Sequence, residues 1–211
     1  MTHVKQFLLA MLIVTIGASK AMATEEAMYR TVLKDKGFEV RLYEPHIVAE
    51  TIVEGDFSGA GSKSFNRLFK YISGSNNSRQ KISMTSPVSQ AAESEKISMT
   101  SPVGQQKEAD GRWAVSFMMP ASFTMATLPE PKDPLVILKQ VPERYIATVR
   151  YSGRWSEERY LYFKGKLDAW IKVNNLIVEG EPTWARYDPP FKPWFMRRNE
   201  VLVPIVKPKL K

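Results

Sequence analysis

The sequence contains the same octapeptide twice. KISMTSPV occupies residues 81–88 and again residues 96–103. In each copy Ile and Met alternate with Ser and Thr, which is the period of a strand with one buried face. The proline then ends ladder pairing, because it has no N–H to donate. The repeat therefore predicts two strands joined by a polar, exposed connection over residues 89–95.

The favoured interpretation of this repeat is structural. Neither copy contains a nucleophile paired with a base, or a cluster of metal ligands. Met84 and Met99 are soft, adaptable side chains that suit a pocket lining or a metal as well as a core. Methionines at alternating buried positions are more often core residues, so scaffold is the first hypothesis and ligand contact the second.

A second, weaker repeat lies beneath the first. Residues 48–58 (VAETIVEGDFS) can be aligned with residues 146–156 (IATVRYSGRWS) at a constant offset of 98 residues. Each copy runs from a strand pattern through a glycine and an aromatic residue into an amphipathic helix pattern. This suggests a duplicated β-α-β-β plan, and hence an α+β fold. Two such halves favour one antiparallel sheet, closed or nearly closed, with two helices packed on it.

Periodicity and punctuation locate the individual elements. A stripe of apolar residues at helical spacing from Phe65 to Ile72 predicts a first helix, which Gly74 ends. Ser156 is a good N-cap for a second helix that buries residues from Tyr160 to Ile171. Strands are predicted at 38–43, 46–53, 113–119, 135–138, 144–151, 183–187 and 199–206.

The first residues have the pattern of a secretory signal. Lys5 precedes a short apolar run, and Ala21-Met22-Ala23 is a small-x-small cleavage site. We expect a signal peptide at 1–23, a single domain at 24–211, and an exported protein that is periplasmic or secreted. The apolar run is short for a membrane span of about 20 residues, so no stable span is expected after removal of the signal. An uncleaved anchor is the alternative.

Composition excludes several kinds of chemistry. The chain has no cysteine, so it has no disulfide, no thiolate chemistry and no covalent haem attachment through C-x-x-C-H. Its net charge is +8, or about +6 without Lys5 and Lys20. This surplus suits an anionic ligand, a membrane surface or nucleic acid. The basic residues are mostly dispersed, so nucleic acid is not the expected partner.

Longer motifs resemble a known family. The paired KISMTSPV segments resemble the I-x-M-T-x-P-V element of the SOUL haem-binding protein family. DPPFKPWFMRRNEVLVPI (188–205) is similar to that family's closing signature, and WAVSFMMP followed by LPEPKDP is similar to its central section. The resemblance extends over roughly residues 28–205. It implies a distorted antiparallel β-barrel of two pseudo-symmetric βαββ halves with two flanking helices.

The resemblance also implies a ligand and a site. The family binds haem and other tetrapyrroles in a shallow apolar cleft between the first helix and a late loop. A basic group beside an apolar groove suits a flat hydrophobic body with two carboxylates. The candidates carried over by position are Lys63, Phe65, Arg67, Leu68, Lys70 and Lys192, the last of these near the propionates. The alternative for Lys63 and Arg67 is an ordinary charge on a helix surface.

Axial ligation of a haem iron is a separate question. His46 is the only histidine outside the leader, and an imidazole can coordinate iron. It follows Pro45 at the start of a predicted strand, distant in sequence from the other candidates. A histidine at a surface or a strand edge is the alternative interpretation.

Three kinds of function remain open at this point. The first is non-covalent haem or tetrapyrrole binding for carriage, buffering or scavenging, without enzymatic activity. One histidine outside the leader and no cysteine exclude most catalytic triads and multi-histidine metal sites from the mature chain. The second is a tetrapyrrole-modifying enzyme that removes the metal. The third is a small-molecule sensor or partner-binding module, because the two-helix barrel plan resembles effector-binding domains of bacterial regulators; its protein partner is unknown.

Overall fold

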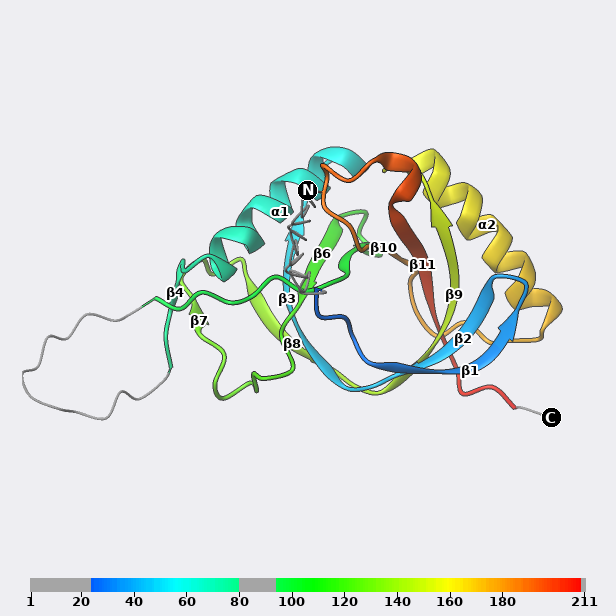
Figure 1. Ribbon diagram of the computed structural model, residues 1–211, viewed down its shortest axis with the longest axis horizontal. Helices are drawn as coiled ribbons and strands as arrows, with labels where there is room; N and C mark the ends of the chain where they lie inside the picture. Colours follow the sequence, from blue (N-terminus) through cyan, green and yellow to red (C-terminus); the bar gives the residue numbers. More distant parts are fainter. Residues whose placement is uncertain (1–23, 80–93, 210–211) are drawn as a thin grey trace, which may run out of the picture.

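The computed structural model describes residues 24–79 and 94–209. The expected signal peptide and the first copy of the octapeptide lie outside these residues. In the described part the elements run from β1 to β11 along the chain (Figure 1). The strands are β1 (Tyr29–Asp35), β2 (Phe38–Tyr43), β3 (His46–Val53), β4 (Asn76–Asn77), β5 (Val103–Lys107), β6 (Trp113–Met118), β7 (Glu130–Pro131), β8 (Ile137–Val141), β9 (Arg144–Ser152), β10 (Thr183–Arg186) and β11 (Arg198–Ile205). The helices are α1 (Phe57–Ile72), α2 (Glu157–Val173) and the 3-10 turn η1 (Trp194–Met196).

One curled antiparallel sheet organises the molecule. Its nine strands follow the order β1-β2-β9-β11-β10-β5-β6-β3-β8, and β4 pairs separately with β7. The strands β1 and β8 stand at the two ends of this order and do not pair with each other. The sheet is therefore an open half-barrel. The α+β class is confirmed, while the expected closed or nearly closed barrel is corrected to a half-barrel.

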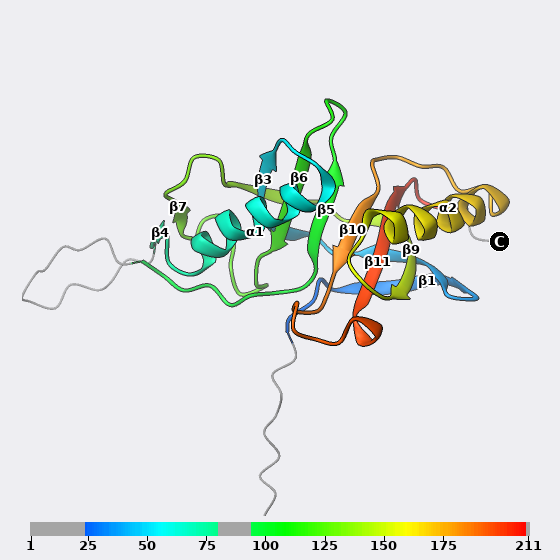
Figure 2. The ribbon, with the colours of Figure 1, turned by 90° about the horizontal axis from the view of Figure 1, so that it is seen from above.

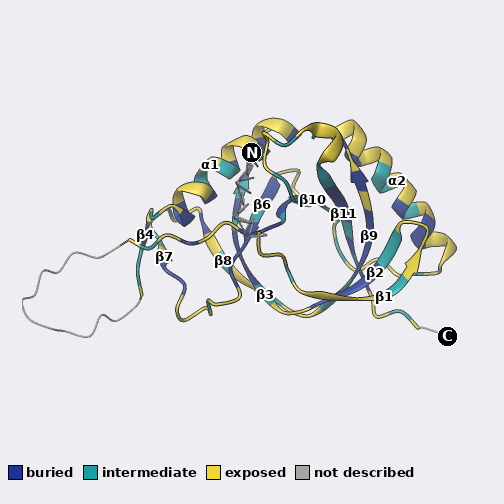
Figure 3. Cartoon of the chain, viewed as in Figure 1, coloured by how far each residue is buried: buried dark blue, intermediate teal, exposed yellow. Residues whose placement is uncertain are grey.

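Both helices cover the convex face of the sheet. Seen from above, α1 lies over one half and α2 over the other (Figure 2). Two hydrophobic clusters lie under the helices: Leu68 and Ile72 of α1 pack with Ala49 and Phe117, and Leu167 of α2 belongs to a second cluster that also includes Phe57 and Ala60 from the start of α1. The helix surfaces turned away from the sheet are exposed (Figure 3). The strands alternate, so the side chains between these core positions face the concave side.

Local signals explain where the two helices begin. Asp56 caps α1 by accepting from the Gly59 N–H at 2.7 Å, and Ser156 caps α2 as predicted. Before each helix a glycine lies in the left-handed region, Gly55 at φ 137° and Gly153 at φ 142°. These conformations turn each strand into its helix at a position that favours glycine. The N-terminal ends of α1 and α2 approach each other at the middle of the convex face, beside η1 (Figures 1 and 2).

The second copy of the octapeptide is not a strand. Residues 96–102 have no strand assignment, and only Val103 begins β5. The segment is extended, but its partners are element ends rather than a ladder: the Ile97 N–H donates to the Ile72 carbonyl at 2.8 Å. Thr100 donates to the Met118 carbonyl. Ile97 is buried and Met99 is 40% exposed, so the expected buried alternation is wrong at Met99.

Candidate functional site

Two cavities lie on opposite faces of the strand β5 and the residues before it. Ser101 and Val103 line a cleft on the convex side. Pro102 and Gly104 line a pocket on the concave side. Successive residues of an extended chain point to opposite faces, so one short segment forms a wall of both cavities.

The convex cleft lies between α1 and the segment that follows β10. Its volume is about 430 Å³. Its lining is mainly apolar, as a binding site for a flat organic ligand requires. Besides Ser101 and Val103, the lining residues used below are Gly61, Ser62, Phe65, Met99, Trp155, Arg186, Tyr187, Pro189 and Pro190.

Arg186 is the cation of this cleft. Its Nε and Nη2 atoms are buried, and no residue in the described part of the chain accepts a hydrogen bond from them. Its guanidinium carbon lies 4.8 Å from the ring centre of Trp184 and 5.4 Å from that of Trp155. Burial lowers the pKa of Arg186 to about 10, so the group is still protonated at neutral pH. Within the described chain no carboxylate pairs with this charge, although Asp188, which is itself paired with Lys192, also lines the mainly apolar cleft.

Other polar atoms under the first turns of α1 also lack partners. The Gln105 side-chain amide donates a hydrogen bond to the Phe57 carbonyl at 2.7 Å. Its Oε1 atom is buried and accepts no hydrogen bond from the described chain. The Ser64 hydroxyl is also buried and has no hydrogen-bond partner among the described residues. A Cβ atom on Gly61 would stand 2.9 Å from Gln105 Oε1 and 3.7 Å from Arg186 Nη2. The glycine therefore allows α1 to approach β5 and Arg186 closely.

Polar contacts fix the late loop beside the cleft. Asp188 accepts from Lys192 Nζ and from the Arg198 backbone N–H, both at 2.5 Å. Arg197 donates to the carbonyls of Lys192 and Pro190. Beyond the prolines, Phe191 is 87% exposed, and Trp194, Phe195 and Met196 of η1 are also exposed. The loop therefore presents aromatic side chains to solvent next to the cleft.

The structure brings only part of the predicted residue set to this cleft. Phe65 lines it. Lys63 and Lys70 are exposed outside its lining, and Leu68 is fully buried in the core beneath α1.

The charges of the other two predicted residues are already engaged. Arg67 pairs with Asp133 at 3.1 Å and donates to the Thr51 hydroxyl at 2.9 Å. Lys192 lies on the late loop, but Asp188 already neutralises its charge.

Sequence reasoning missed Arg186, although one signal was present. Trp184 and Arg186 are two residues apart in β10 and share a face of the strand. Since the tryptophan faces the core, the arginine faces the same side, and a charged residue there is uncommon without a partner. Trp155 was seen only as half of a repeat, and Met99 was assigned mainly to the core.

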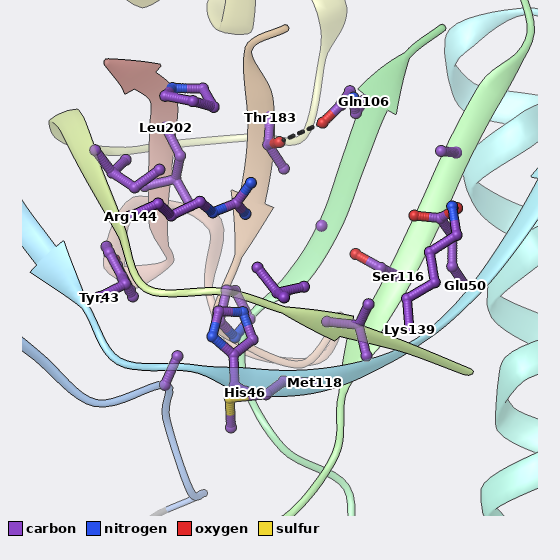
Figure 4. Close-up of a pocket in the computed structure, with 18 of the residues that line it drawn as sticks. Tyr43, His46, Glu50, Gln106, Ser116, Met118, Lys139, Arg144, Thr183 and Leu202 are labelled. Atoms are coloured by element: carbon purple, nitrogen blue, oxygen red, sulfur yellow. Dashed lines mark hydrogen bonds and ion pairs between the residues drawn. The ribbon is translucent and has the colours of Figure 1, made fainter. Parts of the chain in front are cut away.

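The concave pocket is a distinct site with a volume of about 320 Å³ (Figure 4). His46 lines it, together with Met118, Lys139 and Arg144. The imidazole Nδ1 lies 2.9 Å from the Glu44 carbonyl oxygen. Burial lowers the pKa of His46, and the nearby charge of Arg144 lowers it further, so the ring is neutral at pH 7. His46 does not line the convex cleft.

The described residues contain neither a cluster of metal ligands nor a helix suited to a membrane. No group of three or more His, Cys, Asp or Glu side chains in these residues could hold a metal ion. Among the helices of the described chain, none is long and apolar enough to cross a membrane.

The sequence matches the family model of the SOUL heme-binding protein over residues 24–204. The chain belongs to the SOUL heme-binding protein family. Its similar relatives include heme-binding protein 1 of Xenopus tropicalis, 29% identical over 168 residues that cover 78% of this chain and 81% of that protein. Heme-binding protein 1 of Xenopus laevis shows the same identity and coverage. The membership confirms the resemblance read from the octapeptide and the closing motif.

Solved structures share the fold of this SOUL protein at low identity. The C-terminal domain of EcmrR is 14% identical, with a TM-score of 0.55 over 85% of this chain and 99% of that domain. A hydrolase from Listeria innocua is 12% identical, with a TM-score of 0.52 over 83% of this chain and 94% of that one. At these identities the likeness shows the α+β half-barrel alone.

Proposed function

We propose that this SOUL protein binds haem or a related tetrapyrrole non-covalently in the convex cleft between α1 and residues 187–190. The family membership supports the class of ligand. The lining supports the place, because Phe65, Met99 and Trp155 offer flat or adaptable apolar surface to a macrocycle.

The observation that carries the proposal is the uncompensated charge of Arg186. A buried cation without a partner is costly to keep in a folded protein, so its presence indicates a ligand that completes it. A propionate carboxylate fits, since a guanidinium can donate two parallel hydrogen bonds to it. In this role Arg186 replaces Lys192 as the principal anchor, and Lys192 keeps the late loop in place through Asp188.

Apolar contact supplies most of the favourable free energy of binding, and a charge pair with Arg186 adds to it. Burial of roughly 300 Å² of macrocycle contributes about 7 kcal/mol at about 25 cal/mol/Å², before association costs are subtracted. A micromolar complex requires about 8 kcal/mol. Because His46 lies outside the cleft, iron ligation by this residue is not needed, and metal-free protoporphyrin is expected to bind nearly as tightly as haem.

The biological role that we infer is carriage, buffering or scavenging of the tetrapyrrole after export, without chemistry on the ligand. The apolar run before residue 24 supports export, to the periplasm or the exterior. The absence of cysteine from the sequence fits binding that is reversible rather than covalent.

We also infer that the half-barrel arose from a duplication. The order β8-β3-β6-β5 on one side mirrors β2-β9-β11-β10 on the other, with α1 following β3 and α2 following β9. Gly55 and Gly153 are aligned in the sequence repeat, and each adopts a positive φ just before a helix. A ligand cleft at the meeting point of two helix starts is a natural product of such a plan.

The test is an absorption or fluorescence titration with haem and with metal-free protoporphyrin. Arg186→Gln keeps the size of the side chain and removes its charge. We expect this variant to bind both porphyrins about tenfold to a hundredfold more weakly, the value of a charge-assisted contact. The free protein should lose little stability, because the Nε and Nη2 atoms have no hydrogen-bond partner in the described chain, and the contacts with the Trp155 and Trp184 rings are worth about 1 kcal/mol.

Matched controls are Arg112→Gln, which removes an exposed charge paired with Asp110, and Arg144→Gln in the concave pocket. Both should bind porphyrin like the wild type. Unchanged binding by Arg186→Gln would overturn the assignment of the cleft. A strong preference for haem over free porphyrin, lost in His46→Ala, would instead place the ligand on the concave side.

A further inference from the structure

The concave pocket holds a second cation without a counter-ion. The Nε atom of Arg144 is buried, and no described residue accepts a hydrogen bond from it. Figure 4 shows the guanidinium reaching across the pocket toward β10, with no interaction drawn to it. Burial lowers the pKa of Arg144 from its ordinary value. The fold therefore keeps a positive charge partly out of water, at a cost that a bound anion would offset.

The other charged groups of the pocket are already balanced. Lys139 forms an ion pair with Glu50 across β8 and β3. His46 is neutral at pH 7 because burial lowers its pKa. One uncompensated positive charge remains among the described groups that line the pocket, which matches one negative charge on a ligand.

The rest of the wall is suited to an apolar body. The apolar side chains that line the pocket include Val141 at the end of β8, Ile146 in β9, Met118 in β6 and Leu202 in β11. The volume of about 320 Å³ is at the lower end of the range for small-molecule sites. Gly104 also lines the pocket. A Cβ atom at this position would stand 2.8 Å from the Ser116 hydroxyl, so a glycine allows β5 and β6 to approach closely here.

We propose that the concave pocket is a second ligand site, separate from the tetrapyrrole cleft, that takes a small organic monocarboxylate with an apolar chain or ring. Arg144 receives the carboxylate through paired N–H donors, and Val141, Ile146 and Leu202 contact the apolar part. The proposal does not rest on porphyrin binding, since the two linings share no residue.

The experiment is calorimetric titration of the protein with octanoate, with octan-1-ol and octyltrimethylammonium as neutral and cationic probes of similar length. Octanoate should bind, and the alcohol and the cation should bind at least about tenfold more weakly, as expected for the loss of one charge-assisted contact. Arg144→Gln should weaken octanoate by a similar factor and leave porphyrin binding unchanged. Arg186→Gln should show the reverse pattern.

A second variant, which fills the pocket and keeps Arg144, distinguishes loss of the site from a structural effect of the arginine substitution. Val141 ends the edge strand β8 and lines the pocket, so Val141→Trp should fill the cavity with little effect on the sheet. This variant should also lose octanoate. Equal binding of octanoate and octan-1-ol, or octanoate binding that survives both variants, would overturn the proposal. Loss of octanoate binding in Arg186→Gln but not in Arg144→Gln would assign the carboxylate to the convex cleft and would equally overturn it.

Discussion

At the scale of single residues, the largest buried charge network lies around Glu200. This carboxylate is fully buried and accepts from Arg41 at 2.7 Å, from Tyr187 at 2.9 Å and from Arg198 at 2.9 Å. Burial alone would lower the pKa of Arg41, but the hydrogen bond and the charge of Glu200 raise it. The network connects β2, β11 and Tyr187, the residue that follows β10. Tyr187 also lines the convex cleft, so its hydrogen bond to Glu200 connects the cleft wall to this network.

Replacement of Glu200 should be strongly destabilising. Glu200→Gln leaves two guanidinium groups facing each other without the central carboxylate, and we expect a loss of roughly 3 kcal/mol in the free energy of unfolding. Urea denaturation measures this loss. Glu26→Gln is the matched control, because Glu26 pairs with the same Arg198 at a more exposed position and should cost less than about 1 kcal/mol. Similar losses in the two variants would contradict the account.

The sequence could predict residue types at the site better than residue roles. Phe65, one of the candidates on α1, lines the cleft beside the late loop. Arg67 could not be assigned, because its partners Asp133 and Thr51 are far from it in sequence and only the fold brings them together. Arg186 and Arg144 were missed for the same reason: what distinguishes them is a missing counter-ion, and a sequence does not show which charges are paired.

At the scale of elements, close contact between α1 and β5 shapes the convex cleft. Gly61 stands above Gln105, where any side chain would meet the amide oxygen. Gly165 occupies the middle of α2, and a Cβ there would have nothing within 4 Å. The two glycines therefore differ in what they do: the first permits packing, and the second only weakens a helix.

Alanine substitution should separate these two glycines. Gly165→Ala should raise the free energy of unfolding by about 0.5–1 kcal/mol, since alanine is the better helix former. Gly61→Ala should gain nothing in stability, because crowding of Gln105 opposes the same helical gain. It should also weaken porphyrin binding by shifting Arg186. Thermal unfolding and the porphyrin titration measure both effects; a stabilised Gly61→Ala with normal binding would contradict this packing.

The elements with strong periodicity were predictable, and those that depend on neighbours were not. The predicted strands 38–43 and 46–53 coincide with β2 and β3. The strand β1 was missed because YRTVLKD is mostly exposed at the edge of the sheet and carries no clear alternation. The strand β5 (VGQQK) has a polar sequence, and its pairing with β6 and β10 is set by the sheet around it.

At the scale of the whole molecule, the curled sheet separates two cavities. Helix α1, Trp155 and the residues around the start of β5 and the end of β10 line the cleft on the convex face, and strands with their connecting residues line the pocket on the concave face. Sequence repetition indicated the α+β plan but not the opening between β1 and β8, because closure depends on strand curvature rather than on residue pattern. Each face holds one arginine, Arg186 or Arg144, with a buried N–H group that no acceptor in the described chain satisfies.

The most direct test of the central claim is an NMR map of backbone amide shifts on addition of metal-free protoporphyrin, which is diamagnetic. We expect the largest shifts in residues 61–66, 99–103 and 186–190 and at Trp155, with the concave residues 139–146 nearly unaffected. Arg186→Gln should reduce these shifts at equal ligand concentration. Shifts concentrated around His46 and Arg144, with the convex cleft silent, would contradict the account.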